Sequence, residues 1–97
     1  MNDLEELGDS LRRWRKLRGL TAQIVAERAD ITRGTLRSIE TGAGTVQLRN
    51  VLALIKVLGL TRTILDAAEP LNSELGRINA DLLLPERVSR RRRAIEH

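Results

Sequence analysis

Residues 21–42 read TAQIVAERADITRGTLRSIETG, and this stretch decides the fold. Thr21 and Thr32 each precede a run of residues with helical spacing, where a threonine hydroxyl can accept a hydrogen bond from a backbone N–H of the first turn. Asp30 and Gly42 follow these runs, and both residue types tolerate the left-handed backbone that ends a helix. No proline interrupts either run. The stretch therefore predicts two short helices joined by a tight turn.

The side chains within this stretch suit two helices that cross closely. Ala26 is small, so the first helix can approach the second. Leu36 and Ile39 are three residues apart, which places them on one inward face of the second helix, residues 33 to about 41. The polar residues on its opposite side are Arg33, Arg37 and Ser38.

Helical spacing continues on both sides of this pair. A stripe of apolar residues predicts an earlier helix that ends before Gly19, with Trp14 as an anchor of the core. The members of that stripe are Leu4, Leu7, Leu11, Trp14 and Leu17. Thr45 is expected to begin a fourth helix that Gly59 closes, and Thr61 is expected to cap a fifth one. The apolar stripe of the fourth helix is Leu48, Val51, Leu52, Ile55 and Leu58.

The pattern weakens beyond Pro70, and two alternatives remain for residues 72–84. They could form a helix with its cap at Asn72 or Ser73, or residues 78–84 could form an exposed strand. The last residues hold four consecutive arginines and few apolar groups, which predicts a disordered tail. The predicted organisation is a helix-turn-helix domain over residues 1–68, a C-terminal extension over residues 69–85 and a basic tail over residues 86–97.

The composition excludes several classes of function. The 97 residues include no cysteine and a single histidine, His97, so we expect no disulfide, no metal site and no cofactor. No set of titratable side chains suggests an active site, and we do not expect an enzyme. The longest apolar stretch is far shorter than the roughly 20 residues that span a bilayer. The first residues lack the basic and apolar pattern of a leader, so we expect no membrane contact and a cytoplasmic location.

The positive charge is concentrated in one part of the chain. Residues 11–66 hold eleven basic and four acidic residues, although the whole chain has a net charge of only +4. Fifteen of the 17 basic residues are arginine, whose guanidinium can form paired hydrogen bonds with phosphate or guanine. This distribution is typical of a protein that binds a polyanion such as a nucleic acid.

Taken together, these residues resemble the lambda-repressor and Cro-like helix-turn-helix family, also called the XRE family. The resemblance covers roughly residues 7–66. It rests on LRRWRKLRGLT at 11–21, AERA at 26–29, ITR at 31–33, the positions of Leu36, Ile39, Glu40 and Gly42, and the stretch 48–60. It implies an all-α fold, a five-helix lambda-repressor-like DNA-binding domain, here followed by a C-terminal extension, and it implies binding to double-stranded DNA.

The resemblance also implies roles for individual residues. The helix that begins near Thr32 would lie in the major groove and read bases with four residues: Arg33, Gly34, Arg37 and Ser38. The expected contacts to the DNA backbone are Thr21, Gln23, Thr32, Thr35, Gly44 and Thr45. Arg15 and Glu40 would form a structural ion pair between the first and third helices. Ala22 stands where the family commonly has a glutamine that holds a phosphate, so either Gln23 takes that role or the contact is missing.

One recognition helix buries too little surface for tight specific binding, so we expect a homodimer on two half-sites. The candidate dimer surface is the fifth helix with residues 71–84, which carry apolar groups that the small core does not need. The predicted function is a repressor that acts at its own or a neighbouring promoter. The alternative is a DNA-binding antitoxin that represses its own operon and binds a kinase-type toxin through the C-terminal extension.

Overall fold

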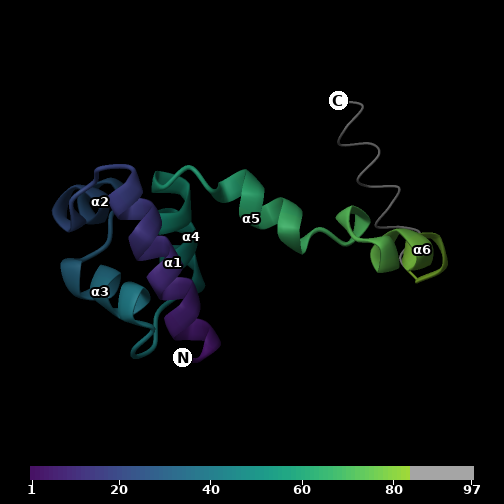
Figure 1. Ribbon diagram of the computed structural model, residues 1–97, viewed down its shortest axis with the longest axis horizontal. Helices are drawn as coiled ribbons and strands as arrows, with labels where there is room; N and C mark the ends of the chain where they lie inside the picture. The colour runs from purple at the N-terminus through teal and green to yellow at the C-terminus, as the bar shows by residue number, and fades with distance from the viewer. Residues whose placement is uncertain (84–97) are drawn as a thin grey trace. The chain divides into compact units, whose positions relative to one another are not determined.

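The structure is a computed structural model that describes residues 1–83 (Figure 1). These residues form helices and no strand, so the all-α prediction is confirmed for this part of the chain. The helices are α1 (Asp3–Leu17), α2 (Ala22–Ala29), α3 (Arg33–Thr41), α4 (Leu48–Val57), α5 (Thr61–Ala68), the short 3-10 helix η1 (Pro70–Asn72) and α6 (Glu74–Leu83). The expected disordered tail, residues 86–97, lies outside the described residues.

Contacts between residues divide the chain into two compact units. The first unit is Met1–Thr61 and contains α1 to α4, whereas the second begins at Arg62 and contains most of α5, then η1 and α6. The domain predicted for residues 1–68 extends one helix further than the first unit. The basic, DNA-reading positions expected from the sequence all lie within the first unit.

Three local signals set the boundaries of α2 and α3, as the sequence predicts. The Thr21 hydroxyl accepts a hydrogen bond from the Ile24 N–H at 3.2 Å, and the Thr32 hydroxyl accepts one from the Thr35 N–H at 3.0 Å. Asp30 ends α2 with φ 55° and ψ 47°, the left-handed conformation that its short polar side chain tolerates. The predicted helix pair and the turn between them are therefore confirmed.

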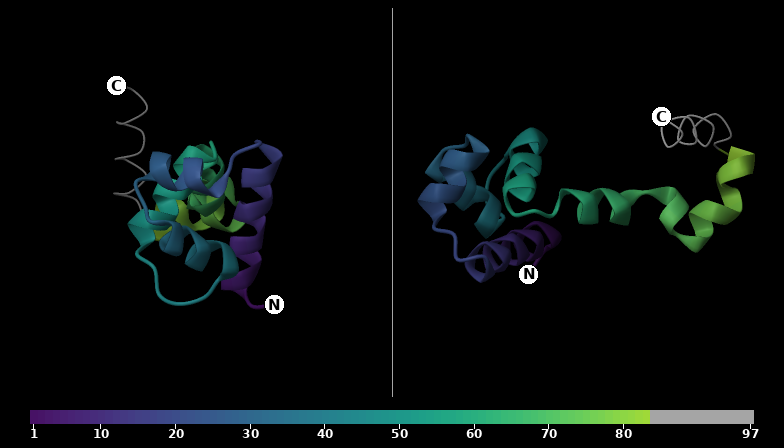
Figure 2. Two further views of the ribbon diagram at one scale, coloured as in Figure 1. Left: turned by 90° about the vertical axis from the view of Figure 1, so that its left-hand side faces the viewer. Right: turned by 90° about the horizontal axis from the view of Figure 1, so that it is seen from above.

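The core of the first unit is built from the inner faces of all four of its helices. α1 packs against α3, and α2 packs against α4, as Figures 1 and 2 show. The buried apolar residues of this unit are Leu11, Val25, Ala26, Ala29, Leu36, Ile39, Leu54, Ile55, Leu58 and Leu60. The inward positions predicted for α2 and α3 are thus confirmed, and their burial leaves the other face of α3 exposed.

Gly8 allows α1 to lie close to the end of α3. A Cβ atom added to Gly8 would lie 2.8 Å from the backbone carbonyl oxygen of Glu40 and closer still to that of Ile39. Real Cβ atoms do not approach backbone atoms so closely, so any larger residue would push the two helices apart. This contact fixes the position of α1 relative to α3.

Two predictions about the first unit are wrong. Trp14 does not anchor the core: its side chain is 41% exposed, and the guanidinium carbon of Arg18 lies 5.6 Å from the ring centroid. Thr45 does not begin the fourth helix, because α4 starts at Leu48, after an extended Gln47 whose side chain makes no capping hydrogen bond. Leu11 is buried in the core, whereas Trp14, three residues later on α1, remains partly exposed.

The second unit settles the alternatives for residues 72–84 in favour of a helix. The Ser73 hydroxyl accepts a hydrogen bond from the Gly76 N–H at 2.9 Å and donates one to the Pro70 carbonyl at 2.9 Å. Ser73 thereby caps α6 and ties it to η1. None of the helices within residues 1–83 has the length and apolar character needed to cross a membrane.

Candidate nucleic-acid interface

The outer face of α3 carries the residues expected to read bases. Arg33, Gly34 and Arg37 are exposed, and Ser38 is half-buried. On the opposite face, Leu36 and Ile39 are buried in the core. Because residues three and four apart share one side of a helix, the two guanidinium groups project from the same side of α3. α3 therefore presents a polar, basic face away from the core.

Two threonine hydroxyls organise the start of α3. Besides capping the helix, the Thr32 hydroxyl donates a hydrogen bond to the Thr35 hydroxyl at 2.9 Å. Thr21 caps α2 by accepting a hydrogen bond, which leaves its own O–H able to donate to an oxygen atom outside the protein. The three hydroxyl groups thus have structural roles that are compatible with the backbone contacts expected for them.

Gln23 makes a contact within its own helix. Its side-chain amide donates a hydrogen bond to the Glu27 carboxylate at 3.3 Å. Gln23 also lines a surface hollow with Glu27, Asp30 and Arg33, whereas Ala22 lines a different hollow beside α1. This contact uses one N–H of the amide and leaves the other, so it does not decide between the two explanations for Ala22.

The residues predicted to read bases do not all line the same concavity. Arg33, Gly34 and Arg37 border a hollow of about 670 Å³ between α1, the start of α2 and α3. Its lining consists of Asp9, Arg12, Ala22, Arg33, Gly34, Leu36, Arg37, Glu40 and Thr41. Ser38 and Gly44 instead border a smaller apolar hollow of about 50 Å³ beside the loop after α3.

The loop between α3 and α4 holds the remaining expected backbone contacts, Gly44 and Thr45. Both residues are exposed, and Gly44 has φ 73°, a conformation that favours glycine. Because α4 begins only at Leu48, Thr45 is not at a helix end. A phosphate bound to the backbone N–H groups of this loop would have no helix N-terminus directly behind it.

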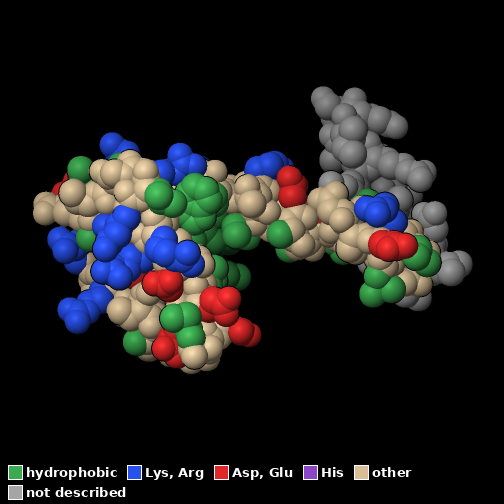
Figure 3. Space-filling view, viewed as in Figure 1, with side chains coloured by type: hydrophobic (Ala, Val, Ile, Leu, Met, Phe, Trp, Pro, Cys, Tyr) green, Lys and Arg blue, Asp and Glu red, His purple; other side chains and the backbone are tan. Residues whose placement is uncertain are grey.

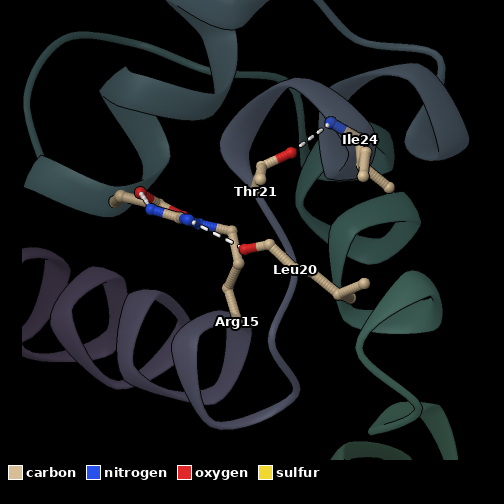
Figure 4. A network of polar contacts seen from close by, with 5 residues as sticks. Arg15, Leu20, Thr21 and Ile24 are labelled. Carbon is tan, nitrogen blue, oxygen red and sulfur yellow. Dashed lines mark hydrogen bonds and ion pairs between the residues drawn. The ribbon is translucent and has the colours of Figure 1, made fainter.

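Arg15 and Glu40 form an ion pair that joins α1 to α3 (Figure 4). Arg15 Nε donates to Glu40 Oε2 at 2.7 Å and Nη2 donates to Oε1 at 3.1 Å, while Nη1 donates to the Leu20 carbonyl at 3.1 Å. The side chains are only 11% and 8% exposed. The hydrogen bonds from Arg15 to Glu40 raise the pKa of Arg15, and burial opposes this only in part. The pair therefore joins the two helices and supports the orientation of α3.

Basic side chains gather on the face formed by α1, α2 and α3 (Figure 3). The first turn of α1 is acidic and contains Asp3, Glu5 and Glu6. It lies at the opposite end of the helix from the basic residues of the last turn. Within residues 1–83, no group of acidic, histidine or cysteine side chains is arranged to hold a metal ion. The dominant chemistry of this face is positive charge, which suits a polyanion.

A comparison with protein families agrees with this geometry. The model of a family described as a helix-turn-helix domain matches residues 6–68, about two thirds of the chain. The chain belongs to this helix-turn-helix family. The resemblance to helix-turn-helix DNA-binding proteins is thereby confirmed. Searches of curated proteins and of solved structures found no match.

Membership assigns a general function to the basic face. Helix-turn-helix domains of this kind are DNA-binding domains of regulators, so this helix-turn-helix protein is a DNA-binding protein. In helix-turn-helix domains the second helix of the motif lies in the major groove, and α3 is the corresponding element of this chain. The exposed basic side of α3 is consistent with that placement.

Arg12 is not among the residues that the resemblance assigns to the DNA interface. The structure places Arg12 in the lining of the larger hollow together with Arg33 and Arg37. No local pattern distinguishes Arg12 from its neighbour Arg13, because the difference depends on where α3 lies relative to α1. The available signal is helical spacing, which puts Arg12 three residues before Arg15, the residue that contacts α3.

Proposed function

We propose that this helix-turn-helix protein is a transcriptional repressor that binds a palindromic operator in double-stranded DNA as a homodimer. The observation that carries the proposal is the outer face of α3, where Arg33 and Arg37 are exposed on either side of Gly34. Neither arginine has an acidic partner within the described residues. Both guanidinium groups are therefore available to base edges or phosphates.

Arg33 is the principal base-reading residue in this proposal. It lies in the first turn of α3, the part of a recognition helix that points at base edges in the major groove. Its guanidinium matches the O6 and N7 acceptors of guanine. Arg37 and Ser38 would contact a neighbouring base or phosphate, and Gly34 would allow close approach. The proposed backbone contacts are Thr21, Gln23, Thr32, Thr35, Gly44 and Thr45.

The second unit supports the dimeric part of the proposal. Leu75 and Ile78 on α6 are 71% and 65% exposed, and Leu65 on α5 is also exposed. Apolar side chains at this spacing on one helix are more stable when a second surface covers them. A second copy of the chain would cover them and bring two α3 helices to one operator, in the cytoplasm where the DNA lies.

The same exposed side chains also favour a second candidate function. As a DNA-binding antitoxin, the protein would repress its own operon and cover Leu75 and Ile78 with a kinase-type toxin. The two candidates differ in what α6 binds. A purified repressor forms dimers by itself through α6, whereas an antitoxin needs its toxin to bury those side chains.

The proposal is tested by measuring stoichiometry on DNA. Sedimentation of the purified protein with a duplex that carries a selected binding site gives the number of chains per duplex. The proposal predicts two chains bound cooperatively, with half-site centres about one helical turn apart. A single chain bound to one half-site with full affinity would contradict the dimeric repressor.

A further inference from the structure

The hollow between α1, α2 and α3 carries an unbalanced positive charge. Arg12 enters its lining from α1, and Arg33 and Arg37 enter from α3. Arg12 is 21 positions before Arg33 in the sequence, yet all three arginines border one volume of about 670 Å³. Like charges brought together in this way repel one another unless an anion lies between them.

The two acidic residues in the lining do not provide that anion. Asp9 pairs with Arg13, with Arg13 Nε 3.1 Å from Asp9 Oδ2, and Glu40 pairs with Arg15. Arg13 and Arg15 are not part of the lining. Arg12, in contrast, has no ion pair with any residue of the described part of the chain. The two acidic residues are thus paired with arginines outside the lining, whereas the arginines of the lining have no acidic partner among residues 1–83.

The hollow is also open where a ligand would have to enter. Ala22 and Gly34 contribute little or no side chain, and a Cβ added to Gly34 would meet nothing nearer than the Thr32 hydroxyl at 3.9 Å. Gln23 is not part of this lining, and its amide donates to Glu27 on its own helix. The lining therefore includes no polar side chain from α2, and Arg12 is the arginine that borders the hollow from α1.

We propose that Arg12 binds a phosphate of the DNA backbone in this hollow, replacing the contact that Ala22 cannot make from the start of α2. Arg33 and Arg37 border the same hollow from α3, where their positive charge also attracts the phosphate while they face the major groove. A guanidinium is suited to this task because its parallel N–H groups match two phosphate oxygens. The inference rests on the proposed DNA binding and adds a residue from outside the helix-turn-helix motif.

The test compares the salt dependence of DNA binding for matched charge variants. Arg12→Gln removes one charge from the hollow, and Arg28→Gln removes one from an exposed position on α2 outside the lining. Each phosphate contact contributes about 0.9 to the slope of log affinity against log salt concentration. We expect Arg12→Gln to lower the slope by about that amount and to weaken binding about ten-fold. Arg28→Gln and Arg12→Lys should keep the slope of the unmodified chain.

An unchanged slope in Arg12→Gln, or an equal loss in Arg28→Gln, would overturn the assignment of Arg12. Circular dichroism of each variant shows that the helices are intact. Failure of the unmodified chain to bind any duplex would contradict the proposed function and the inference together. DNA binding that does not depend on Arg12 would contradict the inference alone. Titration with inorganic phosphate tests whether the hollow binds a free anion. Micromolar binding that depends on Arg12, with an unchanged DNA slope, would identify a site for a free anion and overturn the proposal.

Discussion

The guanidinium of Arg15 and the carboxylate of Glu40 meet in two parallel hydrogen bonds, at 2.7 Å and 3.1 Å. The two residues belong to α1 and α3 and are 25 positions apart in sequence. This bidentate geometry holds the end of α3 against α1, together with the close approach at Gly8. The pair thus holds the last turn of the helix that presents Arg33 and Arg37, and Glu40 borders the same hollow as these two arginines.

Removing one partner of this pair should destabilise the first unit strongly. Arg15→Met leaves the Glu40 carboxylate largely buried without its partner, and we expect a loss of about 3 kcal/mol in the free energy of unfolding. The double variant Arg15→Met, Glu40→Leu should be more stable than Arg15→Met alone, because no unpaired charge remains. Urea unfolding followed by circular dichroism measures both. Equal stability of Arg15→Met and the unmodified chain would contradict a structural role for the pair.

Two glycines within helices should respond oppositely to the same change. Gly8→Ala places a Cβ against the backbone carbonyls of Ile39 and Glu40, and we expect it to destabilise the protein by about 2 kcal/mol. Gly34→Ala meets open space in α3, so the higher helix propensity of alanine should stabilise it by about 0.5–1 kcal/mol. Thermal unfolding of the two variants tests the contrast, and a stabilising Gly8→Ala would show that α1 and α3 are farther apart than described.

Leu11 and Trp14 offer a test of where the core lies. Leu11 is fully buried, and Leu11→Ala should cost about 3 kcal/mol. Trp14 keeps much of its surface in solvent beneath Arg18, and Trp14→Ala should cost about 1.5 kcal/mol, despite the larger side chain. The measurement is again the free energy of unfolding in urea. A larger loss for Trp14→Ala than for Leu11→Ala would restore Trp14 as the anchor of the core.

The parts of the fold that were predictable from sequence are those set by short-range hydrogen bonds. Thr21 and Thr32 cap helices through N–H groups only three residues away, and Asp30 ends α2 by its own backbone conformation. Each of these interactions involves residues that are close together in the sequence, so the sequence alone is enough to predict it. The same local rule was wrong at Thr45, where a suitable residue type is present but the chain begins α4 three residues later.

The parts that were not predictable depend on the positions of helices relative to each other. The size and apolar character of Trp14 predict burial, but its burial depends on which side of α1 the other helices cover. Arg12 and Arg13 are adjacent and chemically identical, yet only Arg12 borders the hollow with Arg33. The expected DNA contacts came from the resemblance to a family, and the residues themselves established only that α3 has a polar side.

The apolar side chains of α6 should govern dimerisation of the purified protein. Leu75→Glu together with Ile78→Glu places two charges in the proposed interface, and we expect the dimer dissociation constant to rise by on the order of a hundred-fold. Leu17→Glu is the matched control, because Leu17 is equally apolar, highly exposed and located in the first unit. Analytical ultracentrifugation measures the dissociation constants. Identical dimerisation of the double variant and the unmodified chain would place the interface elsewhere.

The central claim, that α3 reads bases in double-stranded DNA, is tested most directly by selecting bound duplexes from a random pool. The selection is run with the unmodified chain and with Arg33→Ala, and the enriched sequences are compared. The account predicts a palindromic site for the unmodified chain, with one guanine per half-site whose preference, worth about 1–3 kcal/mol, disappears in Arg33→Ala. Enrichment of the same site with the same preference at every position in both selections would contradict it.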